Sequence, residues 1–106
     1  MDLTNLIFLY CKDLPKDERF NLIDQMNRCS CSIPSNIAEG PGKRSMLQFA
    51  EYLSTSLSSS FELETQLIIC SRRQYGKAIL LNKSLDLVTE IQKMIFTFRE
   101  TVVNPD

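Results

Sequence analysis

Apolar residues recur at three- and four-residue steps along nearly the whole chain, which is the period of an α-helix rather than a strand. The pattern predicts helices at about 3–13, 15–39, 45–75 and from 82 or 84 to about 103. Because short connections imply antiparallel neighbours, we expect one all-α domain over residues 1–106, an antiparallel up-down-up-down four-helix bundle whose first helix is short. The core stripe of the fourth helix is Leu87, Val88, Ile91, Met94, Ile95, Phe98 and Val102.

Particular residues mark where these helices begin and end. Pro15 suits a first helical position, where its missing N–H costs nothing. Gly40 is placed to end the second helix in a left-handed conformation, and Gly76 is placed to end the third. Ser45 and Gln48 fit a capping box at the start of the third helix.

The first predicted helix is apolar nearly all round. Five consecutive apolar or aromatic residues cannot all face one core, so such a helix is usually covered on two sides. We therefore expect this segment to lie at an interface between copies of the chain, which makes the protein its own partner. The five residues are Leu6, Ile7, Phe8, Leu9 and Tyr10.

The middle of the third helix is rich in serine, over residues 54–60. Leu53, Leu57 and Phe61 nevertheless keep the helical period through it, which a flexible linker would lose. Small side chains let a neighbouring backbone come close, and their hydroxyls can bond to carbonyls one turn earlier. The pattern predicts close helix packing here, in preference to a phosphorylated regulatory tract.

Residues 42–45 read Gly-Lys-Arg-Ser, like the end of a phosphate-binding loop. That motif, G-x-x-x-x-G-K-[ST] after a strand, needs a glycine and a hydroxyl where Ile37 and Arg44 stand. The preceding segment also reads as helix, so we reject a nucleotide site. Pro34 instead predicts a kink, because it removes one backbone hydrogen bond and crowds the carbonyl four residues earlier.

Polar residues around this kink predict a side-chain network between the second and third helices. Polar groups at such an interface must find partners or cost stability. We expect Asn36 and Glu39 to bond across the turn, with Lys43 or Arg44 neutralising a carboxylate. A less favoured alternative makes Glu39 and Glu62 a catalytic or metal-binding pair. The network residues are Ser32, Asn36, Glu39, Glu62, Glu64 and Gln66.

Composition argues against most chemistry. The chain has no histidine, which removes the usual general base and the usual zinc and haem ligand. Of the cysteines Cys11, Cys29, Cys31 and Cys70, none forms a CxxC pair, so we expect no metal, no cofactor and no catalytic residues. No apolar run is long enough to span a bilayer and no signal peptide is visible, so a cytoplasmic location without membrane contact is expected.

The turns expected at one end of the bundle gather positive charge. Seven basic residues against four acidic ones leave an excess of three per subunit. An oligomer would repeat this excess in every subunit and so form a basic rim. Such a rim can attract RNA phosphates, and salt weakens the attraction. The alternative, solvated helix-end charges, is favoured by a total net charge of −1. The basic residues are Lys12, Lys16, Arg19, Arg72, Arg73, Lys77 and Lys83, and the acidic ones are Asp13, Asp17, Glu18 and Asp86.

The sequence also resembles a known family. The run SIPSNIAEG at residues 32–40, then GKRS at 42–45 and ELETQL at 62–67, is similar to the bacterial four helix bundle proteins encoded in intervening sequences of large-subunit ribosomal RNA genes. Ser58 stands where that family usually has glycine, and the first helix starts late. The resemblance covers nearly the whole chain.

The resemblance implies an antiparallel bundle that assembles into a ring, typically a homopentamer, with no established enzymatic activity. A related branch, the accessory proteins of diversity-generating retroelements, contacts a reverse transcriptase and nucleic acid, and it is markedly basic. We therefore expect a non-enzymatic, oligomeric scaffold or interaction module. The alternative is a partner of RNA or of a ribonucleoprotein, including a reverse-transcriptase complex, that binds through the basic rim.

Overall fold

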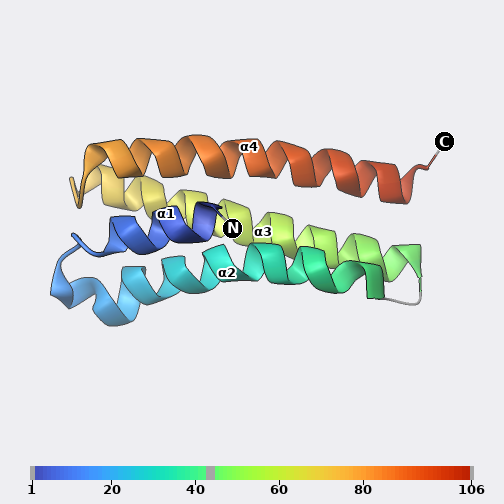
Figure 1. Cartoon of the computed structure of the whole chain (residues 1–106), viewed down its shortest axis with the longest axis horizontal. Helices are drawn as coiled ribbons and strands as arrows, with labels where there is room; N and C mark the ends of the chain where they lie inside the picture. Colours follow the sequence, from blue (N-terminus) through green and yellow to red (C-terminus); the bar gives the residue numbers. More distant parts are fainter. Residues whose placement is uncertain (1, 43–44, 106) are drawn as a thin grey trace.

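The protein is an elongated bundle of α-helices, 46 × 22 × 19 Å (Figure 1). The computed structural model describes residues 2–42 and 45–105, in which there is no strand. Neighbouring helices run in opposite directions, so the predicted up-down-up-down bundle is confirmed. The helices are α1 (Asp2–Cys11), α2 (Asp24–Glu39), α3 (Met46–Arg72) and α4 (Ala78–Val103).

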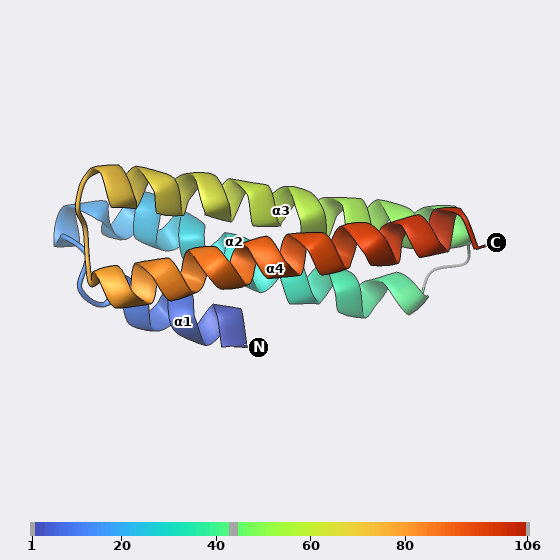
Figure 2. The ribbon, with the colours of Figure 1, turned by 90° about the horizontal axis from the view of Figure 1, so that it is seen from above.

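The first helix is short, as predicted. α1 has ten residues and is therefore about 15 Å long. It packs against both α2 and α4, and its N-terminal end stops near the middle of the bundle (Figures 1 and 2). The slot between α2 and α4 is thus filled by α1 along one half, while α3 lies behind this slot along the whole length.

The hydrophobic core runs the length of the bundle, and every helix contributes to it. On α1 the buried side is made by Leu3, Ile7 and Tyr10, spaced as one face of a helix. The other three helices bury their own stripes against it. The fully enclosed side chains include Met26, Ile33, Leu53, Leu63, Leu67, Cys70 and Val88.

Serines make the close contact between α2 and α3. The Ser56 hydroxyl has no exposed surface and donates to the Ile33 carbonyl on α2, with an O–O distance of 2.8 Å. Ser59 and Ser32 share a hydrogen bond of 2.9 Å across the same interface. The close packing predicted for residues 54–60 is confirmed, because these side chains leave room for the facing backbone.

A left-handed glutamine ends α3. The Tyr75 N–H donates to the Cys70 carbonyl at 3.0 Å, and the Gln74 N–H donates to the Ser71 carbonyl at 3.1 Å. This is the Schellman arrangement, and Gln74 takes its left-handed position with φ 59°. The helix therefore ends at Arg72 rather than at residue 75, where Gly76 had been expected to stop it.

Gly76 has a different role in the same turn. Its φ is +72°, and a Cβ there would lie 2.6 Å from Cε1 of Tyr10, so both conformation and space demand glycine. α4 then begins at Ala78, four residues before the predicted Asn82. The prediction missed this start because Ala78 has no side-chain cap before it.

The left-handed conformation predicted for Gly40 is wrong, although α2 does end at Glu39, and the cap predicted for Ser45 is confirmed. Gly40 has φ −54° and continues the helix into a 3-10 turn, η3 (Gly40–Gly42). It is glycine for lack of space, since a Cβ would lie 2.6 Å from Cε1 of Phe49. Ser45 caps α3, and its hydroxyl accepts from the Gln48 N–H at 3.1 Å.

The second helix begins less regularly than predicted. After Pro15 the chain forms a 3-10 turn, η1 (Lys16–Glu18), and then a π-helical turn, η2 (Arg19–Ile23). The regular α-helix starts only at Asp24, nine residues beyond Pro15. The α-helix then continues without a break through Pro34 to Glu39.

Candidate functional site

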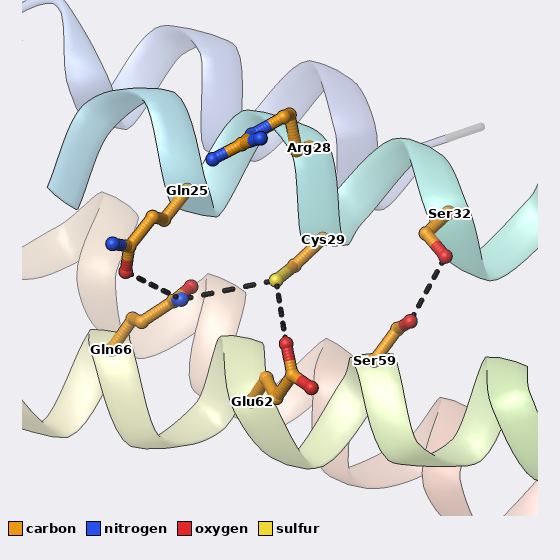
Figure 3. A pocket seen from close by; sticks show the side chains of 7 residues that line it. All are labelled: Gln25, Arg28, Cys29, Ser32, Ser59, Glu62 and Gln66. Carbon is orange, nitrogen blue, oxygen red and sulfur yellow. Dashed lines mark hydrogen bonds between the residues drawn. The ribbon is translucent and has the colours of Figure 1, made fainter. Parts of the chain in front are cut away.

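A polar groove lies between α2 and α3 on the outer surface (Figure 3). Its volume is about 350 Å³. The Gln66 amide donates to Oε1 of Gln25 at 3.3 Å, and the Cys29 thiol donates to Oε2 of Glu62 at 3.5 Å. Oε1 of Gln66 is buried and makes no hydrogen bond within the described part of the chain. The lining residues are Gln25, Arg28, Cys29, Ser32, Ser59, Glu62 and Gln66.

Only some residues of the predicted polar network lie together. Ser32, Glu62 and Gln66 do lie together in this groove. Asn36, however, donates to the carbonyl (2.8 Å) and hydroxyl (3.0 Å) of Ser32 on its own helix, so its predicted bond across the turn is wrong. Glu64 faces α4 instead, where it accepts from Gln92 at 3.2 Å.

Glu39 does not join this network. It is exposed at the end of α2, and its carboxylate makes no hydrogen bond or ion pair to any residue within 2–42 or 45–105. Glu62 contacts Cys29, which is ten residues and thus roughly 15 Å before Glu39 along the helix. The two carboxylates are therefore too far apart for a shared proton or metal. Lys43 and Arg44, predicted to neutralise a carboxylate, lie outside the described residues.

Cys11, Cys29 and Cys70 are at least partly buried, in surroundings that disfavour the thiolate, whereas Cys31 is exposed. Burial raises the pKa of Cys11 to about 12, and burial also raises the pKa of Cys70. The pKa of Cys29 is raised by burial and then by the neighbouring Glu62. These thiols stay protonated at neutral pH, which makes them poor nucleophiles and poor metal ligands. Within the described ranges, no cluster of cysteine or carboxylate side chains is arranged to hold a metal ion.

A buried carboxylate at the other end of α2 was not predicted. Glu18 is 8% exposed and accepts from Arg73 (2.9 Å), Tyr75 (3.1 Å) and Asn21 (3.2 Å). The Tyr10 hydroxyl donates to the Tyr75 carbonyl at 2.6 Å, which joins α1 to the same turn. The sequence pattern placed Glu18 in the first turn of a helix, but nothing in the pattern signals Arg73 and Tyr75, which lie more than fifty residues away.

The seven predicted basic residues do collect at one end of the bundle, where the α1–α2 and α3–α4 turns meet (Figure 1). Two of them are already paired: Arg73 with Glu18 at 2.9 Å and Lys77 with Asp13 at 3.6 Å. Such partly exposed ion pairs contribute little to stability. They do lower the positive electrostatic potential at this end of the bundle.

The other five basic residues differ in their surroundings. Lys12 stands 4.9 Å from the ring centre of Phe8, and Arg19 stands 5.2 Å from that of Phe20. The remaining three are exposed and make no ion pair within the part of the chain that the structure describes. These three are Lys16, Arg72 and Lys83.

The apolar surface of α1 is smaller than predicted. Ile7 and Tyr10 have no exposed surface, so they belong to the core and cannot contact another copy. Leu6 is half-buried. Phe8 and Leu9 are exposed, by 58% and 46%, and they remain candidates for an interface. The helix is covered on one side by its own bundle and is open on the other.

A second apolar surface was predicted to be core. Met94 and Phe98 belong to the α4 stripe, yet they are 63% and 44% exposed. With Ile37 of α2 and with Ile91 and Ile95, they line a trough of about 340 Å³. The trough lies in the half of the α2–α4 slot that α1 does not reach, so the stripe of α4 is longer than the helix that covers it (Figures 1 and 2).

Comparison with known proteins places the chain among proteins of the same shape. A solved structure of a protein of unknown function from the S23 ribosomal protein family, from Bacteroides thetaiotaomicron, superposes with a TM-score of 0.82 at 24% identity. The match covers 93% of this chain and 92% of that one. No curated protein matches the chain. Within residues 2–42 and 45–105, no helix has the length and apolar character needed to cross a membrane.

The family comparison is more specific than the shared fold. The model of the 23S rRNA-intervening sequence protein family matches residues 1–97, which is nearly all of α1 to α4. The residues that suggested this resemblance, 32–40 and 62–67, lie on either side of the α2–α3 interface. The chain therefore belongs to the 23S rRNA-intervening sequence protein family.

Proposed function

We propose that the protein is a non-enzymatic helical bundle that associates with copies of itself and serves as a scaffold or interaction module. The observation that carries this proposal is the apolar surface that stays exposed along the α2–α4 slot. It lies on α1 in one half of the slot and on α4 in the other half. Phe8 and Leu9 project from α1, and Met94 and Phe98 project from α4. A cluster of exposed apolar side chains rimmed by polar residues is typical of a protein interaction site.

The resemblance stated above gives a ring of five subunits as the assembly to test. The experiment is a native mass measurement by sedimentation equilibrium or native mass spectrometry. An assembly that holds together on dilution supports the proposal. A mass that stays at the 12.2 kDa of one chain at every concentration would refute it.

A role in binding RNA is the second candidate. It is supported by the family's description, which refers to the intervening sequence of 23S rRNA, and by the unpaired cations at one end of the bundle. Lys16, Arg72 and Lys83 are free to approach phosphate, whereas Arg73 and Lys77 must first leave their carboxylates. An oligomer would repeat this arrangement in every subunit and so strengthen a weak contact.

The RNA candidate is tested by titrating a structured RNA at low and moderate salt. Binding through phosphate contacts weakens linearly on a logarithmic salt scale, with a slope that reflects the number of contacts. Arg72→Ala should reduce that slope, while Lys93→Ala, an exposed cation in the middle of α4, should leave it unchanged. No binding at low salt, or equal effects of both substitutions, would remove the candidate.

A further inference from the structure

Aromatic rings lie among the cations at the basic end of the bundle. They belong to the α1–α2 and α3–α4 turns, or to the last residues before these turns, and the two turns meet at that end (Figure 1). Surfaces that bind single-stranded nucleic acid combine cations with aromatic rings in this way. Among the described residues, three rings there have a cation near the ring centre: Phe8 with Lys12 at 4.9 Å, Phe20 with Arg19 at 5.2 Å, and Tyr75 with Arg73 at 6.0 Å.

Phe20 is the most accessible of these three rings. It is 85% exposed, compared with 58% for Phe8, and Tyr75 is half-buried. Phe8 already belongs to the surface proposed for self-association, and the Tyr75 hydroxyl donates to Glu18 at 3.1 Å. Phe20 is therefore the ring of the three that neither the core of the bundle nor the proposed assembly uses.

The turn that carries Phe20 is anchored to the rest of the bundle. Glu18 and Leu22 are buried, so residues 19–21 between them lie on the outward side of the chain. Arg73 ties Glu18 to the end of α3 at 2.9 Å. The segment η2 (Arg19–Ile23) is π-helical, and π turns occur frequently at functional sites. A ring on an anchored turn has little freedom left to lose when a ligand covers it.

The exposed residues around Phe20 are charged rather than apolar. Lys16, Asp17 and Asp24 lie about one turn away along the chain, and all three are exposed. Such surroundings are unlike the core of a protein–protein interface, which is depleted of charged residues. A stacked base, in contrast, brings a phosphate that Lys16 and Arg19 can meet. Asp24 is already paired within its own helix, whereas Asp17 opposes a phosphate, so we expect affinity here to depend on stacking more than on charge.

We propose that Phe20 is a stacking platform for an unpaired RNA base, with Lys16 and Arg19 beside it for the adjoining phosphates. This inference rests on the RNA candidate described above and specifies the kind of RNA. The bases of a duplex are stacked on each other and offer no free face, so the RNA must include a single-stranded stretch. Every base has a π-face, so the platform itself selects unpaired bases rather than a sequence.

The absence of tryptophan from the sequence allows a direct test. Phe20→Trp introduces a single fluorescent reporter at the proposed platform, and a base stacked on the indole quenches its emission. The probes are an RNA hairpin with a single-stranded tail and the same hairpin without the tail, both at low salt. Only the tailed hairpin should quench the emission. Phe96→Trp is the matched control, since Phe96 is 54% exposed and lies roughly 27 Å along α4 from the basic end, and neither probe should quench it.

A second variant measures what the ring contributes to binding. Phe20→Ala should raise the dissociation constant of the tailed hairpin about 5- to 150-fold, the range for the loss of one stacked base. The salt slope should stay the same, because no cation is removed. Arg72→Ala should instead reduce the slope. Phe20 is exposed in the single chain, so Phe20→Ala should leave both the fold and the native mass unchanged.

The outcomes separate this inference from the proposed function. Equal quenching by the two hairpins, or an unchanged affinity of Phe20→Ala, would overturn the stacking platform, while a salt slope that Arg72→Ala reduces would still support the RNA candidate. No binding of either hairpin at low salt would overturn both. A smaller native mass of Phe20→Ala would assign the ring to a contact between copies of the chain, and this too would overturn the platform.

Discussion

Ser56 offers a direct test of how α2 and α3 fit together. Its side chain has no exposed surface, and its hydroxyl donates to the Ile33 carbonyl at 2.8 Å. Ser58 is exposed on the same helix two residues later, so the same substitutions can be made at both positions. Because the helix propensity changes equally at the two sites, the difference between them measures the contact with α2.

Two substitutions probe the bond and the available space. Ser56→Ala removes a hydrogen bond worth about 1 kcal/mol, and roughly 0.5 kcal/mol of helix propensity offsets the loss. Ser56→Leu adds volume where α2 leaves none, which typically costs about 1–3 kcal/mol in addition to the bond. We therefore expect a loss of about 2–4 kcal/mol for the leucine variant, or a fall in Tm of about 10 °C or more.

The assay is urea unfolding followed by circular dichroism at the helix band, at one fixed protein concentration. Fixing the concentration matters because self-association shifts apparent stability by mass action. Ser58→Ala and Ser58→Leu should change the free energy of unfolding by no more than about 0.5 kcal/mol. If Ser56→Leu and Ser58→Leu unfold alike, the serine-rich stretch does not determine the spacing of the two helices.

Three further predictions concern a turn and the thiols. Gln74→Gly should raise the free energy of unfolding by about 0.5–1 kcal/mol in thermal denaturation, because a glycine accepts φ 59° without strain; a loss of stability would contradict the assigned turn. Burial raises the pKa of Cys11 from 9.0 to about 12, so the unfolded chain ionises this thiol first. Stability should therefore be unaffected by Cys11 below pH 9 and fall as the pH rises toward 12, and Cys11→Ala should lessen that fall; an equal fall in the variant would refute the cause. Cys31 is exposed and Cys70 is fully buried, so a thiol reagent should modify Cys31 rapidly and Cys70 only as fast as the protein unfolds, with peptide mapping as the readout.

Most of the fold follows from the pattern of the sequence. The helical period predicted the four helices, and the small serines predicted the close α2–α3 contact that Ser56 makes. Helix boundaries were harder to predict where a residue adopts a backbone conformation that its type usually avoids. Gln74 takes a left-handed conformation commonly reserved for glycine. Gly40 is helical, and it is glycine because the Phe49 ring leaves no room for a side chain.

The candidate sites could be predicted less well than the fold. A helical stripe shows which residues share a face, but it does not show how far a neighbouring helix extends along that face. Met94 and Phe98 therefore read as core although α1 ends before reaching them. The buried Glu18 was missed for a related reason, since Arg73 approaches it only after the chain has reversed direction. Long-range partners of this kind leave no local signal.

The central claim is that this bundle exposes apolar surface on α1 and α4 that other copies of the chain cover. Sedimentation equilibrium of the wild-type chain, from dilute to concentrated solution, tests it most directly. The account predicts a multiple of 12.2 kDa that dissociates when Phe8→Asp puts a carboxylate on the exposed surface of α1. A single species of 12.2 kDa throughout that range would contradict it.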